Sequence, residues 1–417
     1  MHLSSKLLKR KRFTLKSFGN SMYPILQSGD ILYYKNTRGN DICTNDIVMV
    51  RKGGRVLTHR LIYKKNKTII TKGDNNLISD GKIYPRNIIA KANKIKRNGQ
   101  IFDFESLYLL QSTFYFQEIV KITNAFKKGK VNFVILKGLP LHLYYENNHP
   151  RRLYLDCDVL ISKKEFSRGE IILLKEGYKK YESSLSSTQK KLKNKKTEIS
   201  YYKIINGYPV VFDLHSETVF MMTQLGKLNV LYPQKFIDQL TDEFLKTKKE
   251  VVIQNEKFSI LNSEFLILYL ALHFFHHNFH GAFRLEFLDK VIRTSMLNRE
   301  SFNRLSLTII KYRLQNFVYP VFLLLKKHYH TPLSTSFFRS IQPANHKIMK
   351  HVLAINIFDD EARVIAGISR FKLLFLLSPR PIWIKSLVFI NPQVIYSIFW
   401  VIRRRLFSFF SNRQKVL

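Results

Sequence analysis

The sequence has few of the features that mark secreted or membrane-spanning proteins. Its only two cysteines, Cys43 and Cys157, are far apart, so we expect no disulfide framework and a reducing, cytoplasmic location. No uncharged apolar run reaches the roughly 18 residues that a spanning helix requires, so no such helix is predicted. The basic start, residues 1–12, is not followed by an apolar segment, which argues against a secretory signal.

Acidic residues are scarce as well. The chain has 30 Asp and Glu against 69 Lys and Arg, a formal net charge of +39, and this excess predicts a polyanionic partner such as nucleic acid, anionic lipid or a phosphorylated substrate. Part of the excess reflects a composition rich in Lys, Asn and Ile, because the lysines are spread over the chain. No RNA- or DNA-reading motif is present, so binding to nucleic acid is indicated by charge alone. No internal repeat is evident.

The 417 residues are enough for two or three domains, and 45% hydrophobic residues with 24% charged residues are typical of globular chains. Residues 13–95 contain short alternating runs, at 31–34, 46–50 and 68–71, separated by Gly, Asn and Asp turns. This pattern predicts a small antiparallel β domain.

The same stretch carries a serine and a histidine within an ordered series of short motifs. These motifs are Gly19-Asn20-Ser21-Met22-Tyr23-Pro24, Gly29-Asp30, Asp46-Ile47-Val48, Thr58-His59-Arg60 and Thr71-Lys72-Gly73-Asp74-Asn75-Asn76. Their order resembles the signal peptidase I family (S24/S26 peptidases), in the branch that pairs serine with histidine. A serine needs a base within hydrogen-bond reach to act as a nucleophile. The resemblance implies that Ser21 is the nucleophile, His59 its base and Asp80 the group that orients the base. The alternative makes Ser21 a helix cap and His59 a surface histidine.

A second motif lies in the middle of the chain, where Asp156 and Asp158 interrupt the apolar run of residues 153–161. Such a run predicts a buried strand, in which side chains alternate, so both carboxylates would lie on one face and Cys157 on the other. Two carboxylates this close resist ionising together unless a cation lies between them, and Mg²⁺ prefers carboxylate and phosphate oxygens. The alternative is one capping and one turn aspartate at a strand end.

Neighbouring segments extend this motif. An apolar strand ends in Lys137-Gly138 before a probable helix, Arg152 precedes the two aspartates, and Asp213 lies in the apolar run of residues 208–215. Over residues 105–330 this series resembles the uncharacterised bacterial nucleotidyltransferase family of the polymerase-β-like superfamily. The resemblance implies that Asp156, Asp158 and Asp213 hold two Mg²⁺ ions and that an NTP is the substrate. It also implies that Lys137 and Gly138 face the nucleotide phosphates, with Arg152 as a basic partner nearby.

The remaining segments carry weaker signals. Helices are predicted at residues 105–128 and 164–176, and the Lys-rich segment 183–200 is expected to be a solvated loop or, alternatively, an arm that contacts phosphate. His273 and His277 share one face of a predicted helix. Their spacing is compatible with zinc, but without an obvious third ligand we favour a structural or nucleotide-facing role.

The tail, residues 371–410, combines aromatic and aliphatic blocks with Arg403-Arg404-Arg405. It predicts either peripheral attachment to the anionic inner face of a membrane or a core helix.

Taken together, these signals predict an α+β multidomain protein. Its parts are a small all-β peptidase-like domain (residues 1–97), a mixed α/β nucleotidyltransferase domain (105–245) and a helical C-terminal region (246–417). The predicted function is bifunctional: metal-dependent transfer of NMP from an NTP to an unknown acceptor, and a Ser/His peptidase-like module acting on a peptide or precursor protein. The alternatives are a non-catalytic peptide- and nucleotide-binding protein and a basic nucleic-acid-binding protein.

Overall fold

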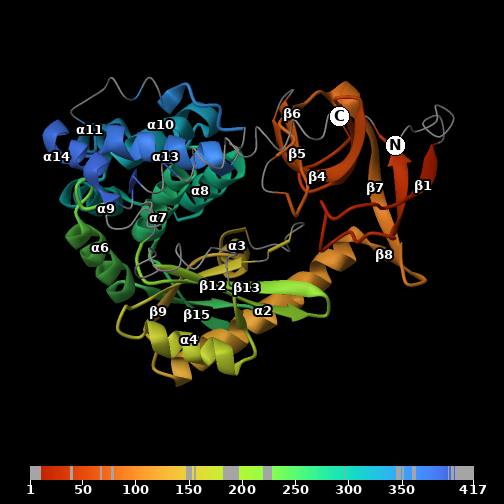
Figure 1. The fold of residues 1–417 in the computed structure, drawn as a ribbon, viewed down its shortest axis with the longest axis horizontal. Coiled ribbons are helices and arrows are strands. Elements are labelled where there is room, and N and C mark those ends of the chain that lie inside the picture. The colour runs from red at the N-terminus through yellow and green to blue at the C-terminus, as the bar shows by residue number, and fades with distance from the viewer. Residues whose placement is uncertain are drawn as a thin grey trace.

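A computed structural model describes the chain from residue 11 to residue 399. The residues left out within this range are 38–40, 66–67, 77–78, 147–152, 155, 182–196, 219–227, 296, 344–348, 350–351, 359–362, 393 and 396–398. Arg152, most of the Lys-rich segment and Arg403-Arg404-Arg405 lie outside the described residues. An all-β unit, a mixed α/β unit and a helical region follow one another along the chain (Figure 1), which confirms the predicted α+β multidomain class.

The first unit is an antiparallel sheet with the strand order β1-β2-β7-β3-β4-β5-β6, and β8 pairs with β7. Its elements are β1 (Arg12–Lys16), β2 (Ile31–Asn36), β3 (Ile47–Lys52), β4 (Arg55–Lys65), β5 (Thr68–Lys72), β6 (Lys82–Ile83), the short 3-10 helix η1 (Pro85–Asn87), β7 (Ile88–Arg97) and β8 (Gln100–Asp103). The β3–β4 turn consists of Gly53 and Gly54, both with positive φ (54° and 74°), as a tight two-residue hairpin requires. Separate groups of apolar side chains cover the two faces of this sheet.

Helix α2 (Phe104–Lys128) joins the first unit to the second. It begins at Asp103, whose carboxylate accepts a hydrogen bond from the Ser106 amide at 2.7 Å. Its first turns bury Phe104 and Tyr108 in the core of the all-β unit. The later turns bury Ile119 and Phe126 in the large core of the α/β unit. One helix of 25 residues, about 37 Å long, thus contributes to two cores.

The second sheet has the strand order β11-β12-β13-β10-β9-β15-β14. Its strands are β9 (Phe133–Lys137), β10 (Asp156–Ile161), β11 (Lys179–Lys180), β12 (Glu198–Ile205), β13 (Tyr208–His215), β14 (Lys249–Ile253) and β15 (Glu256–Ile260), accompanied by α3 (Leu139–Glu146), α4 (Phe166–Lys175) and α6 (Gln234–Lys246). Strands β10 and β13 run parallel, as do β9 and β15. The sheet extends past the predicted boundary at residue 245, because the β14–β15 hairpin pairs with β9 after helix α6.

The helical region is built around α7, in which ten side chains are buried, at residues 265–272, 274 and 275. Its elements are α7 (Ser263–His276), α8 (Ala282–Thr294), α9 (Arg299–Lys311), α10 (Gln315–Tyr329), α11 (Thr335–Ser340), α13 (Arg363–Leu377), α14 (Ile382–Ser386) and the 3-10 helix η3 (Leu387–Ile390). None of the described helices is both long enough and apolar enough to cross a bilayer.

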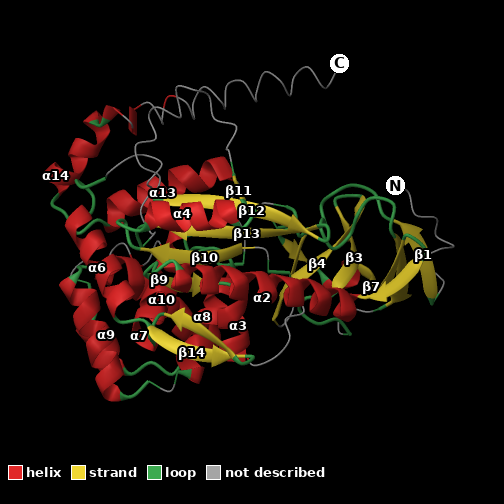
Figure 2. Cartoon of the chain, turned by 90° about the horizontal axis from the view of Figure 1, so that it is seen from below, coloured by secondary structure: helices red, strands yellow, loops and turns green. Residues whose placement is uncertain are grey.

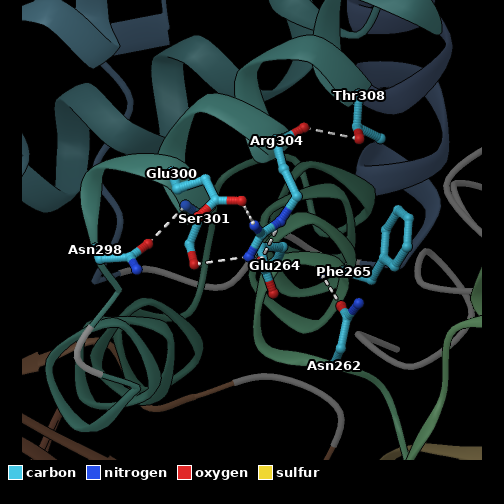
Figure 3. Close-up of polar contacts among 8 residues, drawn as sticks. All are labelled: Asn262, Glu264, Phe265, Asn298, Glu300, Ser301, Arg304 and Thr308. Atoms are coloured by element: carbon cyan, nitrogen blue, oxygen red, sulfur yellow. Dashed lines mark hydrogen bonds and ion pairs between the residues drawn. The ribbon is translucent and has the colours of Figure 1, made fainter.

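The first turns of α7 and α9 are tied together by polar contacts (Figure 3). Asn262 accepts a hydrogen bond from the Phe265 amide at 2.9 Å, and Asn298 accepts one from the Ser301 amide at 2.8 Å, so each asparagine caps its helix. Arg304 on α9 then pairs with Glu264 of α7 at 2.6 Å. The Arg304–Glu264 pair links the two helices, although an exposed ion pair of this kind adds little stability.

The all-β unit contacts both of the other parts of the chain. Tyr208, the first residue of β13, is buried in the core of the all-β unit. Next to it, the Tyr23 hydroxyl donates to the Gly207 carbonyl at 3.2 Å. On the other side, the rings of Tyr63 and Phe358 lie 4.6 Å apart. The all-β unit is therefore packed directly against the α/β sheet and the helical region.

Candidate functional site

Ser21 lies in the irregular segment between β1 and β2, and two features hold it there. Its neighbours Met22 and Ile25 are buried in the core of the all-β unit. The Ser21 carbonyl accepts a hydrogen bond from the Asn75 amide at 2.8 Å. Gly73 is needed beside it, because a Cβ at that position would lie 2.5 Å from the Ser21 carbonyl oxygen. The turn after β5 thus forms a backbone support for Ser21.

The structure brings Ser21, His59 and Asp80 together. His59, on β4, has its Nε2 3.1 Å from Ser21 Oγ and its Nδ1 2.7 Å from Asp80 Oδ2. Because a carboxylate only accepts hydrogen bonds, Nδ1 carries the proton and donates it to Asp80, which leaves the Nε2 lone pair to accept from the Ser21 hydroxyl. Thr71 donates a further hydrogen bond to Asp80 Oδ2 at 2.7 Å. This is the arrangement in which a neutral imidazole can take a proton from a serine.

A buried ion pair supports the same loop from the other side. Arg60 follows His59 on β4, and its guanidinium makes a two-fold contact with Asp74, at 2.7 and 2.6 Å. It also donates to the Asn45 carbonyl and to the hydroxyl of Tyr108 on α2. Burial alone would lower the pKa of Arg60, but the Asp74 carboxylate outweighs it and raises the pKa above its ordinary value. The Asp74 carboxylate thus supports the turn after β5 through this buried ion pair.

A cavity of about 370 Å³ lies beside Ser21. It is lined by Asn20, Tyr23, Gln27, Ser28 and Asn75. Asn20 is the neighbour of Ser21, and Asn75 is the residue whose amide supports it. The cavity therefore lies next to the residues that flank and support Ser21.

In the second sheet, three carboxylates converge. Asp156 and Asp158 lie on β10 and Asp213 on β13, and Asp158 and Asp213 are direct partners across these parallel strands. One oxygen from each carboxylate lies within 4.8 Å of the others. Asp158 is buried, whereas the Asp156 side chain is 52% exposed, so the group opens toward solvent on the Asp156 side.

Lys137 and His215 neutralise part of this charge. The Lys137 ammonium, at the end of β9, lies 3.2 Å from Asp158 and 3.5 Å from Asp156. His215, at the end of β13, donates from Nε2 to Asp158 Oδ1 at 2.8 Å. Gly138 follows Lys137 with φ of 120°, and a Cβ there would lie 3.2 Å from the Asp156 carbonyl. Glycine at this position therefore lets β9 end close against β10.

The three carboxylates differ in how readily they ionise. Burial would raise the pKa of Asp158, but Lys137 and His215 outweigh it and lower that pKa below its ordinary value. Burial, followed by the neighbouring Asp158 charge, raises the pKa of Asp213 to about 6. Asp213 Oδ1 is buried without a hydrogen-bond partner, and so is Asp158 Oδ2, which has only its ion pair with Lys137.

This donor set fits a hard divalent cation. Mg²⁺ takes oxygen ligands from one or two carboxylates together with phosphate and water. Here Asp158 Oδ2 and Asp213 Oδ1 are buried without hydrogen-bond partners and belong to one cluster. Burial and the Asp158 charge also hold Asp213 back from ionising. A cation would satisfy both oxygens and remove the repulsion between Asp158 and Asp213. Asp156, Asp158 and Asp213 would hold it.

Two family models match this chain, one over each of the two parts that contain these groups of residues. A family model described as an uncharacterised nucleotidyltransferase matches residues 105–330, more than half of the chain. The chain belongs to this nucleotidyltransferase family. A second family model, peptidase S24-like, matches residues 1–102. The nucleotidyltransferase domain thus carries an S24-like domain in front of it.

Other comparisons add little to this assignment. Among solved structures, the protein is similar to an antigenic nucleotidyltransferase-like protein from Paracoccidioides brasiliensis. The two chains share 12% sequence identity and a TM-score of 0.33 over 57% of this chain and 93% of that chain. No curated protein matches this chain.

His273 and His277, at the end of α7, lie close enough to Lys137 for its charge to act on both imidazoles. The rings of His273 and His277 are 4.7 Å apart, and Tyr269 stacks on His273 at 5.9 Å. Burial, followed by the charges of Lys137 and Arg284, lowers the pKa of His273 well below its ordinary value, so this imidazole is neutral at pH 7. Among the described residues, the residues grouped closely enough to hold a metal ion are Asp156, Asp158 and Asp213, and the structural or nucleotide-facing role of His273 and His277 stays a prediction.

Three functional neighbours were not singled out from the sequence. Thr71 was part of a motif but not recognised as a partner of Asp80. His215 was visible in the Asp-Leu-His sequence without an assigned role. Tyr269, whose pKa is raised well above its ordinary value by burial and then by the Asp158 charge, had no sequence signal beyond its apolar helix.

Proposed function

We propose that the protein transfers a nucleoside monophosphate from an NTP to an acceptor hydroxyl at the site formed by Asp156, Asp158 and Asp213. The convergence of three carboxylates within 4.8 Å, on two parallel strands of a nucleotidyltransferase-family domain, carries this proposal. Carboxylates clustered in this way can bind the divalent metal ion that accompanies a nucleoside triphosphate.

The residues of the site have distinct roles in this proposal. The three aspartates hold one or two Mg²⁺ ions, and bound Mg²⁺ supplies stabilisation of the charge that develops on the phosphates during transfer. Lys137 lies against the same carboxylates, where its ammonium can donate to a phosphate oxygen. His215 keeps Asp158 oriented and ionised through its 2.8 Å hydrogen bond. Gly138 has no side chain, so the phosphates can approach the backbone at the end of β9.

A labelling experiment tests this function. The protein is incubated with each of the four NTPs labelled on the α-phosphate, with Mg²⁺ and an extract that supplies acceptors. We expect label to be transferred with one or more NTPs. Asp158→Asn should abolish the transfer, and the matched surface variant Asp242→Asn on α6 should not. Absence of transfer, with NTP still bound tightly, would support the binding-protein alternative instead.

We infer a second activity, hydrolysis of a peptide by Ser21 with His59 as base and Asp80 as its orienting partner. The hydrogen-bonded series from Ser21 through His59 to Asp80 supports it, since a domain used only as a scaffold has no evident need for this alignment. Asp80 and Thr71 position His59, and the backbone contact from Asn75 positions Ser21.

A fluorophosphonate probe, which acylation-competent serines attack, tests the second activity without knowledge of the substrate. We expect the probe to label the wild-type protein and to leave Ser21→Ala unlabelled. Ser28→Ala, a change of the same kind in the wall of the adjacent cavity, serves as the matched control and should label normally. Equal labelling of wild type and Ser21→Ala would remove Ser21 from the mechanism.

A further inference from the structure

The end of the helical region presents large apolar side chains to solvent. Helix α14 lies at its outer edge (Figures 1 and 2), and η3 follows α14 directly along the chain. Trp383 is 69% exposed and Ile390 70% exposed, values usually found for charged side chains. The set, which we call the apolar patch, consists of Ile382, Trp383, Leu387, Phe389, Ile390, Ile395 and Phe399.

The apolar patch belongs to a segment that is firmly attached to the protein. Val388 and Val394, which alternate with patch residues, are completely or almost completely buried. Lys385 Nζ donates to the Phe375 carbonyl at 2.9 Å, and Ser378 Oγ donates to the Leu231 carbonyl at 2.6 Å. One side of this segment is therefore packed against the helical region, while the other side, equally apolar, remains uncovered among the described residues.

The charge of the surrounding sequence is of one sign. After Glu361 the chain contains no Asp or Glu. It contains ten basic residues there: Arg363, Arg370, Lys372, Arg380, Lys385, Arg403, Arg404, Arg405, Arg413 and Lys415. An apolar surface within an exclusively basic segment is complementary to a partner that combines apolar material with negative charge.

We propose that the apolar patch inserts into the surface of an anionic lipid bilayer. Tryptophan and phenylalanine partition to the membrane interface, and lysine and arginine bind the head groups around them. Four of the seven patch residues are aliphatic, which favours acyl chains over nucleic acid, because bases stack on aromatic or guanidinium groups. The segment lies on the bilayer and does not cross it, and the binding is independent of both proposed activities.

Trp383 provides a direct reporter, since the chain has only two tryptophans. In a Trp400→Phe background, Trp383 emission is recorded with vesicles of phosphatidylcholine alone and with vesicles of phosphatidylcholine and phosphatidylglycerol in equal parts. We expect a shift to shorter wavelength with the anionic vesicles, weakened by salt. Lipids brominated on their acyl chains should quench this emission.

A pair of triple variants separates insertion from simple charge attraction. Ile382→Ser/Trp383→Ser/Ile390→Ser should sediment with anionic vesicles at least about tenfold more weakly than the wild type. The matched control, Ile101→Ser/Ile204→Ser/Val252→Ser, replaces three other apolar side chains that are more than half exposed and should bind normally. Circular dichroism verifies that both variants are folded.

Three results would overturn the proposal. The first is that the wild type ignores anionic vesicles. The second is that both triple variants bind vesicles equally. The third is that Trp383 escapes quenching while polyuridylate, a nucleic-acid competitor, displaces all vesicle binding, which would identify charge-driven binding to a polyanion.

Discussion

The three aspartates of the second sheet are chemically unequal, although the sequence presents them as equivalent. Asp158 is buried between Lys137 and His215, which together keep it ionised. Asp213 faces Asp158 across the strand pair and has no cation of its own among the described contacts. In the metal-free protein, ionisation of Asp213 therefore costs free energy, and a bound cation would offset that cost.

This inequality predicts how stability depends on pH. The folded-state pKa of Asp213 is about 6, above its ordinary 3.8, so the folded protein binds more protons than the unfolded chain between these values. The free energy of unfolding of the metal-free wild type should therefore fall as pH rises from about 4 to 6, relative to Asp213→Asn, and then level off. A shift of roughly two pKa units corresponds to at most about 3 kcal/mol.

Chemical denaturation in EDTA at several pH values measures this difference. Asp242→Asn, at an exposed aspartate on α6, controls for the loss of a surface charge. If the free energies of unfolding of the wild type and Asp213→Asn differ by the same amount at every pH, Asp213 is not held back from ionising.

Asp80 decides which nitrogen of His59 carries the proton. In Asp80→Asn the amide can donate to Nδ1, which favours the tautomer with the proton on Nε2, and this tautomer cannot accept from Ser21. We expect fluorophosphonate labelling to slow by roughly 10³- to 10⁴-fold, as in other relays of this type. Thr71→Val should cause a smaller loss, because Asp80 keeps its bond to His59.

Labelling rates at a fixed probe concentration provide the measurement. Asp41→Asn, which removes an exposed carboxylate from the same unit, is the control and should label at the wild-type rate. Normal labelling of Asp80→Asn would mean that His59 is oriented by other groups.

At the scale of elements, the turn after β5 determines where Ser21 lies. Gly73→Ala would place a methyl group 2.5 Å from the Ser21 carbonyl oxygen and 2.7 Å from Nδ2 of the Asn76 side chain, so one segment must move. We expect loss of most probe labelling together with destabilisation of roughly 1–3 kcal/mol.

Gly54→Ala is the matched control for this change. It strains a hairpin with φ of 74° but has no atom within 4 Å of the added methyl group. It should cost about 1 kcal/mol and leave labelling intact. Thermal unfolding and probe labelling of both variants test the distinction, and equal labelling would show that Ser21 tolerates movement of its support.

Elements of this protein were largely predictable where the pattern was local. The runs at 31–34, 68–71 and 208–215 alternate or are continuously apolar, and they form β2, β5 and β13. The β14–β15 hairpin was missed because its membership of the second sheet depends on pairing with β9, more than a hundred residues earlier. Periodicity carries no information about such long-range pairing.

The candidate sites were likewise predictable where the signal was local and not where it depended on long-range pairing. The order of motifs indicated Ser21, His59 and Asp80, and the alternation of β10 indicated Asp156 and Asp158. The ion pairs of Lys137 and the hydrogen bond from Thr71 could not be predicted, because each depends on how two strands are aligned in space. A lysine before a glycine reads equally well as a free phosphate ligand or as a counter-ion to buried carboxylates.

At the scale of the whole molecule, β13 joins the two proposed sites. Its first residue, Tyr208, is buried in the core of the all-β unit, and its sixth residue is Asp213. Tyr208→Ala should destabilise the protein by roughly 3–5 kcal/mol and should also weaken Mg²⁺ binding, because Asp213 loses the anchor that sets its strand. Tyr312→Ala, a buried tyrosine of the helical region, should destabilise the protein without affecting Mg²⁺ binding.

Titration of Mg²⁺ against both variants, at a temperature where each is folded, measures this coupling. Unchanged Mg²⁺ affinity in Tyr208→Ala would show that the second sheet holds Asp213 without help from the all-β unit.

The contact between Tyr23 and Gly207 also limits the distance between Ser21 and Asp213. Ser21 is two residues from Tyr23, and Asp213 is six residues along the chain from Gly207. At about 3.3 Å per residue, with the length of one tyrosine side chain, Ser21 and Asp213 are no more than roughly 40 Å apart. An extended peptide of about a dozen residues would be long enough to reach from one to the other. A molecule shorter than the separation of Ser21 and Asp213 cannot contact both residues at once, so the length of a ligand distinguishes binding at one of them from binding across both.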